Sequence, residues 1–415
     1  MSLVDRPNYV SWLERWRGHD LVKVLTGVRR CGKSTILQLY RTRLLDQGVP
    51  ASHILNFNLE DPDSERDFAS DLRLYEHVKR AASGAQPCYV FIDEAQHLAE
   101  FERTIAGLAS QPNIDVYVTG SNSDFLSGDL ATRLTGRYVE RHVLPLSYVE
   151  YSAADQPETA RPGAAPTDPW ANYVRHGGFP YVTRLGGDVA MIQQYLSSVV
   201  NTIVLKDVAP RQTSFTPALF DGVLEFMMDN IGNLTNIKRV SDTLTSTGRK
   251  TGRSAVEHYI DGLVASFLLY RVPRFDIKGK VYLENSAKYY AVDPGVRRAL
   301  LGGQCPDWGN LLENIVFLEL LRRGHRVSVG KVGQTEIDFI AESDGTRAYF
   351  QVSQRAESPE SLTRELAPLR AAPDHYPRWL LVGHDGPACP MPASSRCPFA
   401  TGCSAGDRRP RGRRR

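Results

Sequence analysis

The sequence lacks any apolar stretch long enough to span a membrane, because charged residues interrupt each stretch well before about 18 positions. Its first twenty residues also lack the basic and then apolar order of a secretory signal. Cysteine is scarce, with 6 residues in 415, and the spacing of Cys389, Cys397 and Cys403 matches no common zinc site. These absences argue against membrane-spanning, disulfide-rich and zinc-binding classes. They predict a cytoplasmic protein with no membrane partner.

A strong net charge is also missing from most of the chain. The formal net charge is +3, but residues 383–415 contain seven Arg, no Lys and two Asp, which leaves the rest of the chain slightly acidic. Any nucleic-acid interface therefore needs a local basic patch. The content of 42% hydrophobic and 23% charged residues is ordinary and argues against collagen-like, coiled-coil and wholly disordered classes.

Composition and periodicity divide the chain into five predicted segments. These are an α/β domain at 1–151, a linker or insertion at 152–169, a helical region at 170–301, a small α/β domain at 302–382 and a disordered Pro/Cys/Arg-rich tail at 383–415. In the first segment, short apolar runs alternate with helical patterns, as a parallel sheet requires. The five expected strands are residues 21–27, 53–59, 88–93, 115–120 and 138–144.

The strongest motif is GVRRCGKST, which satisfies G-x-x-x-x-G-K-[ST] between an apolar strand and a helical pattern. Backbone N–H groups of such a loop and of the helix N-terminus surround the β-phosphate of a nucleotide. We expect Lys33 to pair with β- and γ-phosphate oxygens, and the Ser34 hydroxyl to ligate Mg²⁺. A glycine loop with a purely structural role is the alternative. The candidate nucleotide-binding residues here are Gly27, Val28, Arg29, Arg30, Cys31, Gly32, Lys33, Ser34 and Thr35.

A second motif, CYVFIDEAQ, is an apolar strand that ends in two carboxylates. Asp93 is expected to orient the metal and Glu94 to act as the general base that polarises the attacking water. An ordinary strand-end turn explains the pair less well when the glycine-rich loop precedes it in the same chain.

The strand VYVTGSNS carries Thr119, Ser121 and Asn122 at its end, and Asn122 is a candidate contact to the γ-phosphate or to the lytic water. A helix cap explains the same residues almost as well. Downstream, Arg133 and Arg137 are candidate arginine fingers for a nucleotide in a neighbouring subunit, with Arg137 preferred. A surface or interdomain ion pair is the alternative for both.

Between 170 and 301, helical patterns at 219–232, 237–248 and 254–269 precede strand-like segments at 281–285 and 288–293. Three helices followed by a β-hairpin outline a winged helix-turn-helix, a module that binds DNA or protein. Arg249, Lys250 and Arg253 at the third helix are candidate phosphate contacts. A solvated helix start is the equal alternative, because Glu257 and Asp261 follow on that helix.

The motifs GVRRCGKS, FIDEAQ, TGSNS and TRLTGR, followed by PLSYVEY, together resemble the bacterial and archaeal AAA+ superfamily ATPases that end in a domain of unknown function. The similarity runs from about residue 5 to 381. It implies an α/β fold with a P-loop NTPase parallel sheet of the additional-strand type, a winged-helix-like segment and a small nuclease-like α/β domain. It also implies ATP and Mg²⁺ as ligands.

The last predicted domain contains a hairpin around residues 344–345, which would place Asp338 opposite Gln351 and Glu336 opposite Ser353. The other face would hold the apolar residues Ile337, Phe339, Phe350 and Val352. Glu313 and Glu319 of the preceding helix are each candidates to join the polar cluster, but not both, because six residues turn a helix by about 240°.

This layout resembles the PD-(D/E)xK nuclease fold. Its E-x-K positions read Gln351-Val352-Ser353 here, so an amide replaces a carboxylate ligand and no ammonium is expected in the cluster. Nuclease activity is therefore not expected. Lys331 is the one residue considered for the missing lysine role, and its position before the hairpin disfavours it.

The leading hypothesis is a Mg²⁺-dependent ATPase whose hydrolysis drives a conformational switch of the C-terminal domains. Its partners would be DNA or a protein, and a homo-oligomer is possible. The alternative is an ATP-gated nucleic-acid-binding protein with a degenerate nuclease domain. A small-molecule kinase is disfavoured, because Glu94 suits water activation. The motifs at 177–180 and at Lys206-Asp207 are expected to pack between domains rather than to catalyse.

Overall fold

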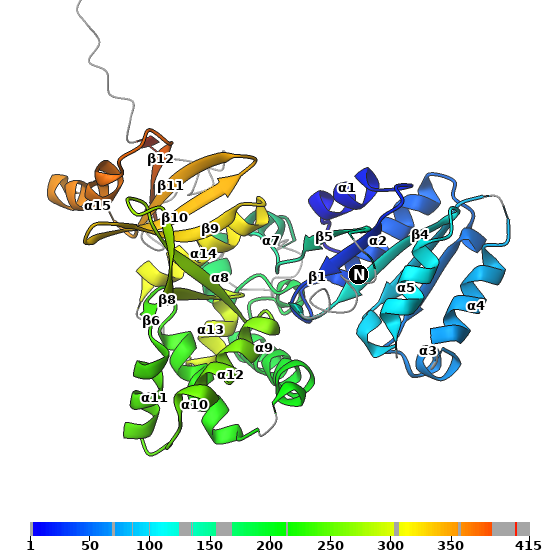
Figure 1. Cartoon of the computed structure of the whole chain (residues 1–415), viewed down its shortest axis with the longest axis horizontal. Coiled ribbons are helices and arrows are strands. Elements are labelled where there is room, and N and C mark those ends of the chain that lie inside the picture. Colours follow the sequence, from blue (N-terminus) through cyan, green and yellow to red (C-terminus); the bar gives the residue numbers. More distant parts are fainter. Residues whose placement is uncertain are drawn as a thin grey trace, which may run out of the picture.

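A computed structural model of the chain shows two lobes, with the N-terminal sheet and its helices in one and the remaining elements in the other (Figure 1). It describes residues 3–68, 71–84, 86–98, 100–123, 134, 136–154, 168–212, 215–302, 307–355, 358–383 and 403–404. No helix within these residues is both long and apolar enough to cross a membrane.

The N-terminal lobe contains a five-stranded sheet of order β2-β3-β4-β1-β5, and every strand pair is parallel. This confirms the predicted parallel α/β architecture of a P-loop ATPase. The strands are β1 (Val22–Thr26), β2 (Ile54–Asn58), β3 (Cys88–Asp93), β4 (Ile114–Gly120) and β5 (Tyr138–His142). The helices are α1 (Pro7–Arg15), α2 (Lys33–Asp46), α3 (Pro62–Asp67), α4 (Asp71–Ala81) and α5 (Phe101–Ala109).

Both faces of this sheet are covered, because alternate side chains of each strand point to opposite sides. Leu25 and Tyr117 belong to the core formed with α1 and α2, whereas Val24 and Val118 belong to the core formed with α4 and α5. The first of these cores continues without a break into the helices of the other lobe. The carboxyl ends of β1, β3 and β4 meet at one edge, where we expect ligands of such sheets to bind.

The middle of the chain is helical and ends in a long β-hairpin. Its elements are α7 (Tyr148–Ala154), α8 (Pro169–His176), α9 (Val189–Ile203), the π-helix η6 (Val204–Val208), α10 (Pro217–Asp229), β6 (Leu234–Thr235), α11 (Ile237–Ser246), α12 (Arg253–Ala265), β7 (Leu269–Asp276), β8 (Val281–Ala291) and α13 (Pro294–Leu300). Short 3-10 helices occur at Ala51–His53, Ala95–His97, Pro180–Arg184 and Ala209–Arg211.

The predicted hairpin of residues 281–285 and 288–293 is wrong. Both segments belong to the single strand β8, and its antiparallel partner is β7, which was predicted as helix at its start. The two residues between the predicted strands, Ser286 and Ala287, include no glycine, which two-residue hairpin turns favour. The actual turn follows Asp276, whose carboxylate accepts hydrogen bonds from the N–H groups of Lys278 and Gly279.

The C-terminal part adds α14 (Trp308–Arg322), β9 (Arg326–Val332), β10 (Thr335–Ser343), β11 (Thr346–Ser353), α15 (Pro359–Ala371) and β12 (Arg378–Val382). Its strands and the β7–β8 hairpin form one eight-stranded sheet of order β13-β12-β11-β10-β9-β7-β8-β6. The predicted tail is described only at Gly383 and at β13 (Cys403–Ser404), which pairs with β12. The rest of the tail lies outside the described residues.

The predicted register of the β10–β11 hairpin is confirmed, since Phe339 pairs with Phe350 and Ser343 with Thr346. Phe339 and Val352 face a common core, as expected, and residues of α14 belong to the same core. Ile337 does not, because it packs with Ile340 on the other face. The pairing of β10 with β9 shifts by one residue between Ile337 and Ile340, and such a bulge reverses the alternation.

Candidate functional site

The glycine-rich loop joins the end of β1 to the start of α2, so its backbone turns at a helix N-terminus. Gly27 has a φ of 146°, and a Cβ there would lie 2.2 Å from the carbonyl oxygen of Val143. Only glycine fits this close approach. The buried Lys33 ammonium donates to the carbonyl oxygens of Gly27 at 2.9 Å and Val28 at 3.3 Å. The carbonyl groups of the loop thus hold the Lys33 ammonium close to the N-terminus of α2.

Arg6 supports this loop from outside the motif. Its buried guanidinium donates to the carbonyl oxygens of Cys31 at 3.1 Å and Leu144 at 3.0 Å, and it pairs with Glu150 at 2.7 Å. Sequence reasoning missed Arg6, because no motif surrounds it. Cys31 is a buried core residue, and burial raises the pKa of its thiol.

Asp93 lies at the end of β3 beside Ser34 and Thr119. Thr119 donates to Asp93 Oδ1 at 2.5 Å and accepts from the backbone N–H of Glu94 at 2.8 Å. Burial raises the pKa of Asp93, and hydrogen bonds from Ser34 and Thr119 oppose the rise. A hydroxyl and a carboxylate side by side suit Mg²⁺, which usually takes one or two protein ligands and completes its shell with phosphate and water.

Glu94 follows in the left-handed region, with a φ of 53°. Its Oε1 lies 3.4 Å from the Lys33 ammonium, and its Oε2 accepts a hydrogen bond from Gln96 at 2.5 Å. Burial acts to raise the pKa of Glu94, but Lys33, Gln96 and Arg29 outweigh it and hold the pKa below its usual value. Glu94 is therefore an ionised carboxylate at neutral pH, able to accept a proton.

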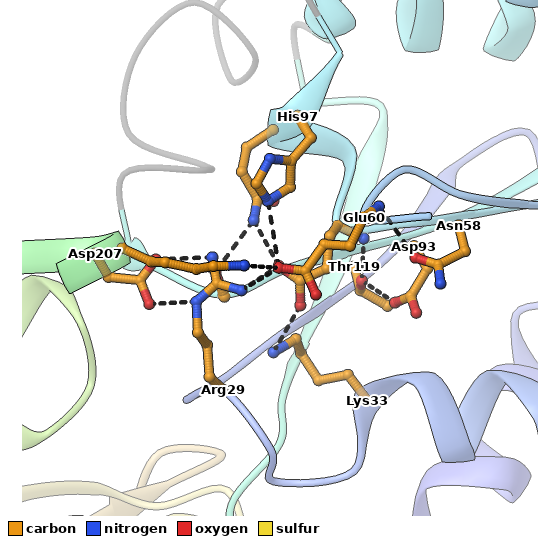
Figure 2. A network of polar contacts seen from close by, with 12 residues as sticks. Arg29, Lys33, Asn58, Glu60, Asp93, His97, Thr119 and Asp207 are labelled. Carbon is orange, nitrogen blue, oxygen red and sulfur yellow. Dashed lines mark hydrogen bonds and ion pairs between the residues drawn. The ribbon is translucent and has the colours of Figure 1, made fainter. Parts of the chain in front are cut away.

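Arg29 connects the loop with the helical region (Figure 2). Its Nε donates to Asp207 Oδ2 at 2.6 Å, and one terminal nitrogen donates to Glu60 Oε1 at 2.6 Å. Glu60 also lies 3.1 Å from Lys206 and 3.6 Å from His97, and the hydrogen bond from His97 is the largest of the contacts that lower its pKa. The motif at 206–207 therefore packs on the loop, as predicted.

A cavity of about 730 Å³ opens over these residues. Six cationic side chains line it against three carboxylates, so the cavity favours an anion. The cations are Arg6, Arg29, Arg30, Lys33, Arg184 and Lys206, and the carboxylates are Glu60, Asp93 and Glu94. Another part of the wall is apolar or aromatic, formed by Val4, Leu146, Pro180, Tyr181, Tyr195 and Val199. Such a mixture suits a ligand with a charged and a planar part.

Most of the expected site residues meet at this cavity. Arg29, Arg30, Gly32, Lys33, Ser34, Thr35, Asp93 and Glu94 line it, and Gly27, Val28 and Cys31 form the loop beneath. Asn122 does not line it. Ser121 contacts it indirectly, since its hydroxyl donates to Asp207 at 3.4 Å and accepts from Gln96 at 3.1 Å.

The two candidate arginine fingers lie elsewhere. Arg137 is exposed, and its carbonyl accepts from Val22, so it lies at the edge of the sheet opposite the loop. It cannot reach the cavity of its own chain. Arg133 falls outside the described residues.

A second buried polar cluster lies between α14, β8 and β10. The Lys288 ammonium is 3.2 Å from Glu313 Oε2 and 2.9 Å from Glu336 Oε1, and Tyr290 donates to Glu313 at 3.0 Å. Burial acts to lower the pKa of Lys288, but Glu313 and Glu336 outweigh it, and the pKa is raised. The expectation that no ammonium joins this cluster is wrong, because Lys288 comes from a strand of the helical region.

The other residues that were expected in this cluster have different partners. Asp338 accepts a hydrogen bond from the N–H of Val352 at 2.7 Å, and burial raises its pKa with help from Glu313. Glu319 pairs with Arg322 and Arg323 instead. Lys331 lies 4.0 Å from Asp276, and the Ser353 hydroxyl donates to the carbonyl of Arg355. Within the described part of the chain, no group of three or more His, Cys, Asp or Glu side chains is arranged to hold a metal ion.

The fold and the loop define the class as a P-loop protein of the AAA type. A family model described as an AAA domain matches residues 19–152, and a domain of unknown function, DUF8612, matches residues 167–306. An uncharacterized protein of Haemophilus influenzae is 37% identical over 384 residues, which cover 92% of this chain and 94% of that protein. The chain belongs to the same family of AAA-domain proteins as this relative.

An uncharacterized protein of Methanocaldococcus jannaschii is 27% identical over 339 residues, which cover 77% of this chain and 71% of that protein. Among solved structures, the Walker-type ATPase PABY2304 of Pyrococcus abyssi is 16% identical, with a TM-score of 0.49 over 72% of this chain and 96% of that one.

Proposed function

We propose that this protein binds ATP with Mg²⁺ in the cavity over the glycine-rich loop and hydrolyses it. The observation that carries the proposal is the lining of that cavity, where six cations face three carboxylates at the N-terminus of α2. A triphosphate is the anion that such a loop and helix start are built to hold. The aromatic part of the wall, where the rings of Tyr181 and Tyr195 lie 5.0 Å apart, suits the base.

The residues have separate roles in this proposal. Lys33 and the backbone N–H groups of the loop bind the β- and γ-phosphates, and Ser34 and Asp93 hold the Mg²⁺ that comes with the nucleotide. Glu94 accepts the proton of a water whose oxygen forms a bond to the γ-phosphorus. The bond from that phosphorus to the bridging oxygen breaks, the oxygen keeps the electron pair, and the products are ADP and phosphate.

Removal of the loop lysine tests binding. Lys33→Ala is expected to weaken ATP affinity at least about 100-fold, because it deletes a buried cation from the phosphate site. Isothermal titration calorimetry with ATP and Mg²⁺ measures this, and Lys79→Ala on α4 is a matched control. The parent protein giving no binding heat at millimolar ATP would refute the proposed function.

We further propose that nucleotide state is coupled to the C-terminal part of the chain. The support is the pair of contacts from the ATPase lobe to η6, Arg29 with Asp207 and Glu60 with Lys206. Asp207 is 4% exposed, so a change at the loop that breaks its contact with Arg29 leaves a buried charge unpaired. A phosphate bound beside Arg29 would attract the same guanidinium, so binding or release of the phosphate would change the ion pair of Arg29 with Asp207.

A second candidate function is ATP-gated binding of nucleic acid through a winged-helix-like arrangement of α10, α11, α12 and the β7–β8 hairpin. One observation favours it, a group of exposed cations on α11, in the turn after it and at the start of α12. They are Lys238, Arg239, Arg249, Lys250 and Arg253. Exposed Glu257 and Asp261 on α12 reduce the local positive charge.

Salt-dependent DNA binding tests this candidate. If the start of α12 and the turn before it contact phosphates, the double variant Lys250→Glu/Arg253→Glu should lower affinity and reduce the slope of log K against log salt by about 2. Fluorescence anisotropy with duplex DNA measures this, and Lys79→Glu is the control. Binding that disappears on removal of residues 384–415 alone would assign it to the Arg-rich tail and contradict the candidate.

We propose that the nuclease-like C-terminal part cleaves nothing. The support is Gln351 in place of a carboxylate, together with Lys288, whose ammonium pairs with Glu313 and Glu336, the carboxylates that a divalent cation would need. These residues do not fit a metal site, and the part is proposed to serve as a scaffold.

A further inference from the structure

We propose that Arg29 is a catalytic arginine of the ATPase, supplied by the glycine-rich loop of the same chain, and that Asp207 is the positioning residue that holds it. This inference rests on the proposed function. It assigns to the Arg29 side chain a role beyond the contacts that the loop backbone makes, and it requires no second chain.

The position of Arg29 relative to Glu94 is the first support. A terminal nitrogen of Arg29 lies 3.9 Å from Glu94 Oε2, and the Lys33 ammonium lies 3.4 Å from Oε1 of the same carboxylate. Two cations therefore flank the proposed base. Since the base must lie beside the water that attacks the γ-phosphorus, a cation this close to it lies at the γ end of the triphosphate. Arg29 also lines the cavity directly.

The way Arg29 is held is the second support. Its side chain is almost buried, and Nε and a terminal nitrogen donate to the two oxygens of Asp207 at 2.6 and 3.2 Å, in the fork geometry that fixes a guanidinium. A third N–H donates to Glu60 at 2.6 Å. Arginine has five N–H donors, so two remain beyond these hydrogen bonds. A cation fixed before the reaction stabilises developing charge better than one that must first be ordered.

Asp207 is well placed to fix the arginine from another part of the chain. It belongs to the π-helical turn Val204–Val208, a backbone form that often occurs at functional sites. It receives a further hydrogen bond from Ser121, the residue after the end of β4, at 3.4 Å. The position of the Arg29 guanidinium at the γ-phosphate therefore depends on the helical region remaining packed against the loop.

The rival source of such a charge is Arg137 of a neighbouring chain, because Arg137 lies at the far edge of its own sheet. The two sources make different kinetic predictions. An arginine in the same chain gives turnover per chain that is independent of protein concentration, whereas an arginine from a neighbour gives turnover that rises as chains associate.

The experiment compares Arg29→Ala with the parent in single-turnover hydrolysis and in nucleotide binding. We expect the rate constant to fall on the order of 10³-fold while the affinity for ATP stays within about tenfold, because the loop and Lys33 remain. We also expect Arg29→Ala to lose tight binding of ADP with aluminium fluoride, a mimic of the transferring phosphoryl group, but to retain ADP. Arg29→Lys should recover part of the rate, and Arg43→Ala on α2 is the surface control.

Asp207→Asn tests the positioning role. It preserves volume but removes the charge that fixes the guanidinium, so we expect a rate constant about tenfold or more lower, with ADP affinity unchanged and with aluminium fluoride binding weakened as in Arg29→Ala. A purely structural role would instead lower ADP affinity and thermal stability together. Circular dichroism melts of each variant distinguish loss of folding from loss of rate.

The outcomes separate this inference from the function on which it rests. If the parent protein hydrolyses no ATP, both the proposed ATPase function and the catalytic role of Arg29 are refuted. A parent that hydrolyses ATP while Arg29→Ala stays within about threefold of it overturns the role of Arg29 alone. Parent turnover per chain that rises with protein concentration also overturns it, since the charge then comes from a second chain.

Discussion

Replacing Glu94 with glutamine is expected to leave ATP bound and to lower kcat by about 10²- to 10⁴-fold, the usual contribution of a general base. Glutamine keeps the shape of the side chain and its acceptor oxygen but cannot take the proton of the attacking water. Radiolabelled ATP retained after gel filtration, combined with steady-state phosphate release, measures both properties. Glu76→Gln, an exposed residue of α4, is the matched control.

The pH dependence of kcat provides a second test of Glu94 as the base. Because Lys33, Gln96 and Arg29 hold the pKa of Glu94 below its usual value, the carboxylate stays ionised between about pH 6 and 8. Glu94 therefore contributes no pH dependence to kcat in that range. Equal hydrolysis by Glu94→Gln and the parent would remove the assignment of the base, as would a parent kcat that falls steeply below pH 7 and loses this fall in Glu94→Gln.

The second large effect is on stability. Lys288→Met is expected to lower the free energy of unfolding by about 3–5 kcal/mol, because it removes one partner of a buried ion pair and leaves Glu313 without its cation, whereas Glu336 keeps Arg274 at 3.3 Å. Lys288 is 4% exposed, so water does not replace the lost contact. Urea unfolding followed by tryptophan fluorescence measures the change. Lys331→Met, whose ammonium lies 4.0 Å from Asp276 at the surface, should cost less than about 1 kcal/mol.

The difference in unfolding free energy between Lys288→Met and the parent should become smaller as the pH falls from 7 to 5. Burial already raises the pKa of Glu313, and loss of the ammonium raises it further. A carboxyl group whose pKa is higher in the folded state than in the unfolded state penalises folding only while it is ionised, so the penalty is lost at lower pH. A deficit that grows on acidification, or one below about 1 kcal/mol at pH 7, contradicts the assigned role of Lys288.

The parts of the site that the sequence predicts are those encoded by neighbouring residues. The loop motif places Lys33 and Ser34 at a helix start whatever else the chain does, because β1, the loop and α2 are continuous. The strand that ends in Asp93 and Glu94 is equally local. Residues 206–207 were expected only to pack between domains, and their contact with Arg29 depends on tertiary structure.

Three sets of contacts could not be predicted, because they arise from packing between distant segments. Arg6 contacts Cys31 and Leu144 across 25 and 138 positions of sequence, and Arg29 contacts Asp207 across 178. Lys288 reaches Glu313 only because β8 lies beside α14 in the folded chain. Periodicity also failed where one residue changes the pattern, as in the bulge of β10 that turns Ile337 to the other face.

The eight-stranded sheet has a mechanical consequence. Parallel pairing of β7 with β9 places the hairpin of the helical region and the strands of the C-terminal part in one hydrogen-bonded slab. These two parts cannot rotate against each other without breaking backbone hydrogen bonds along that seam. If the proposed coupling through Asp207 holds, a displacement there would move these two parts together rather than one against the other.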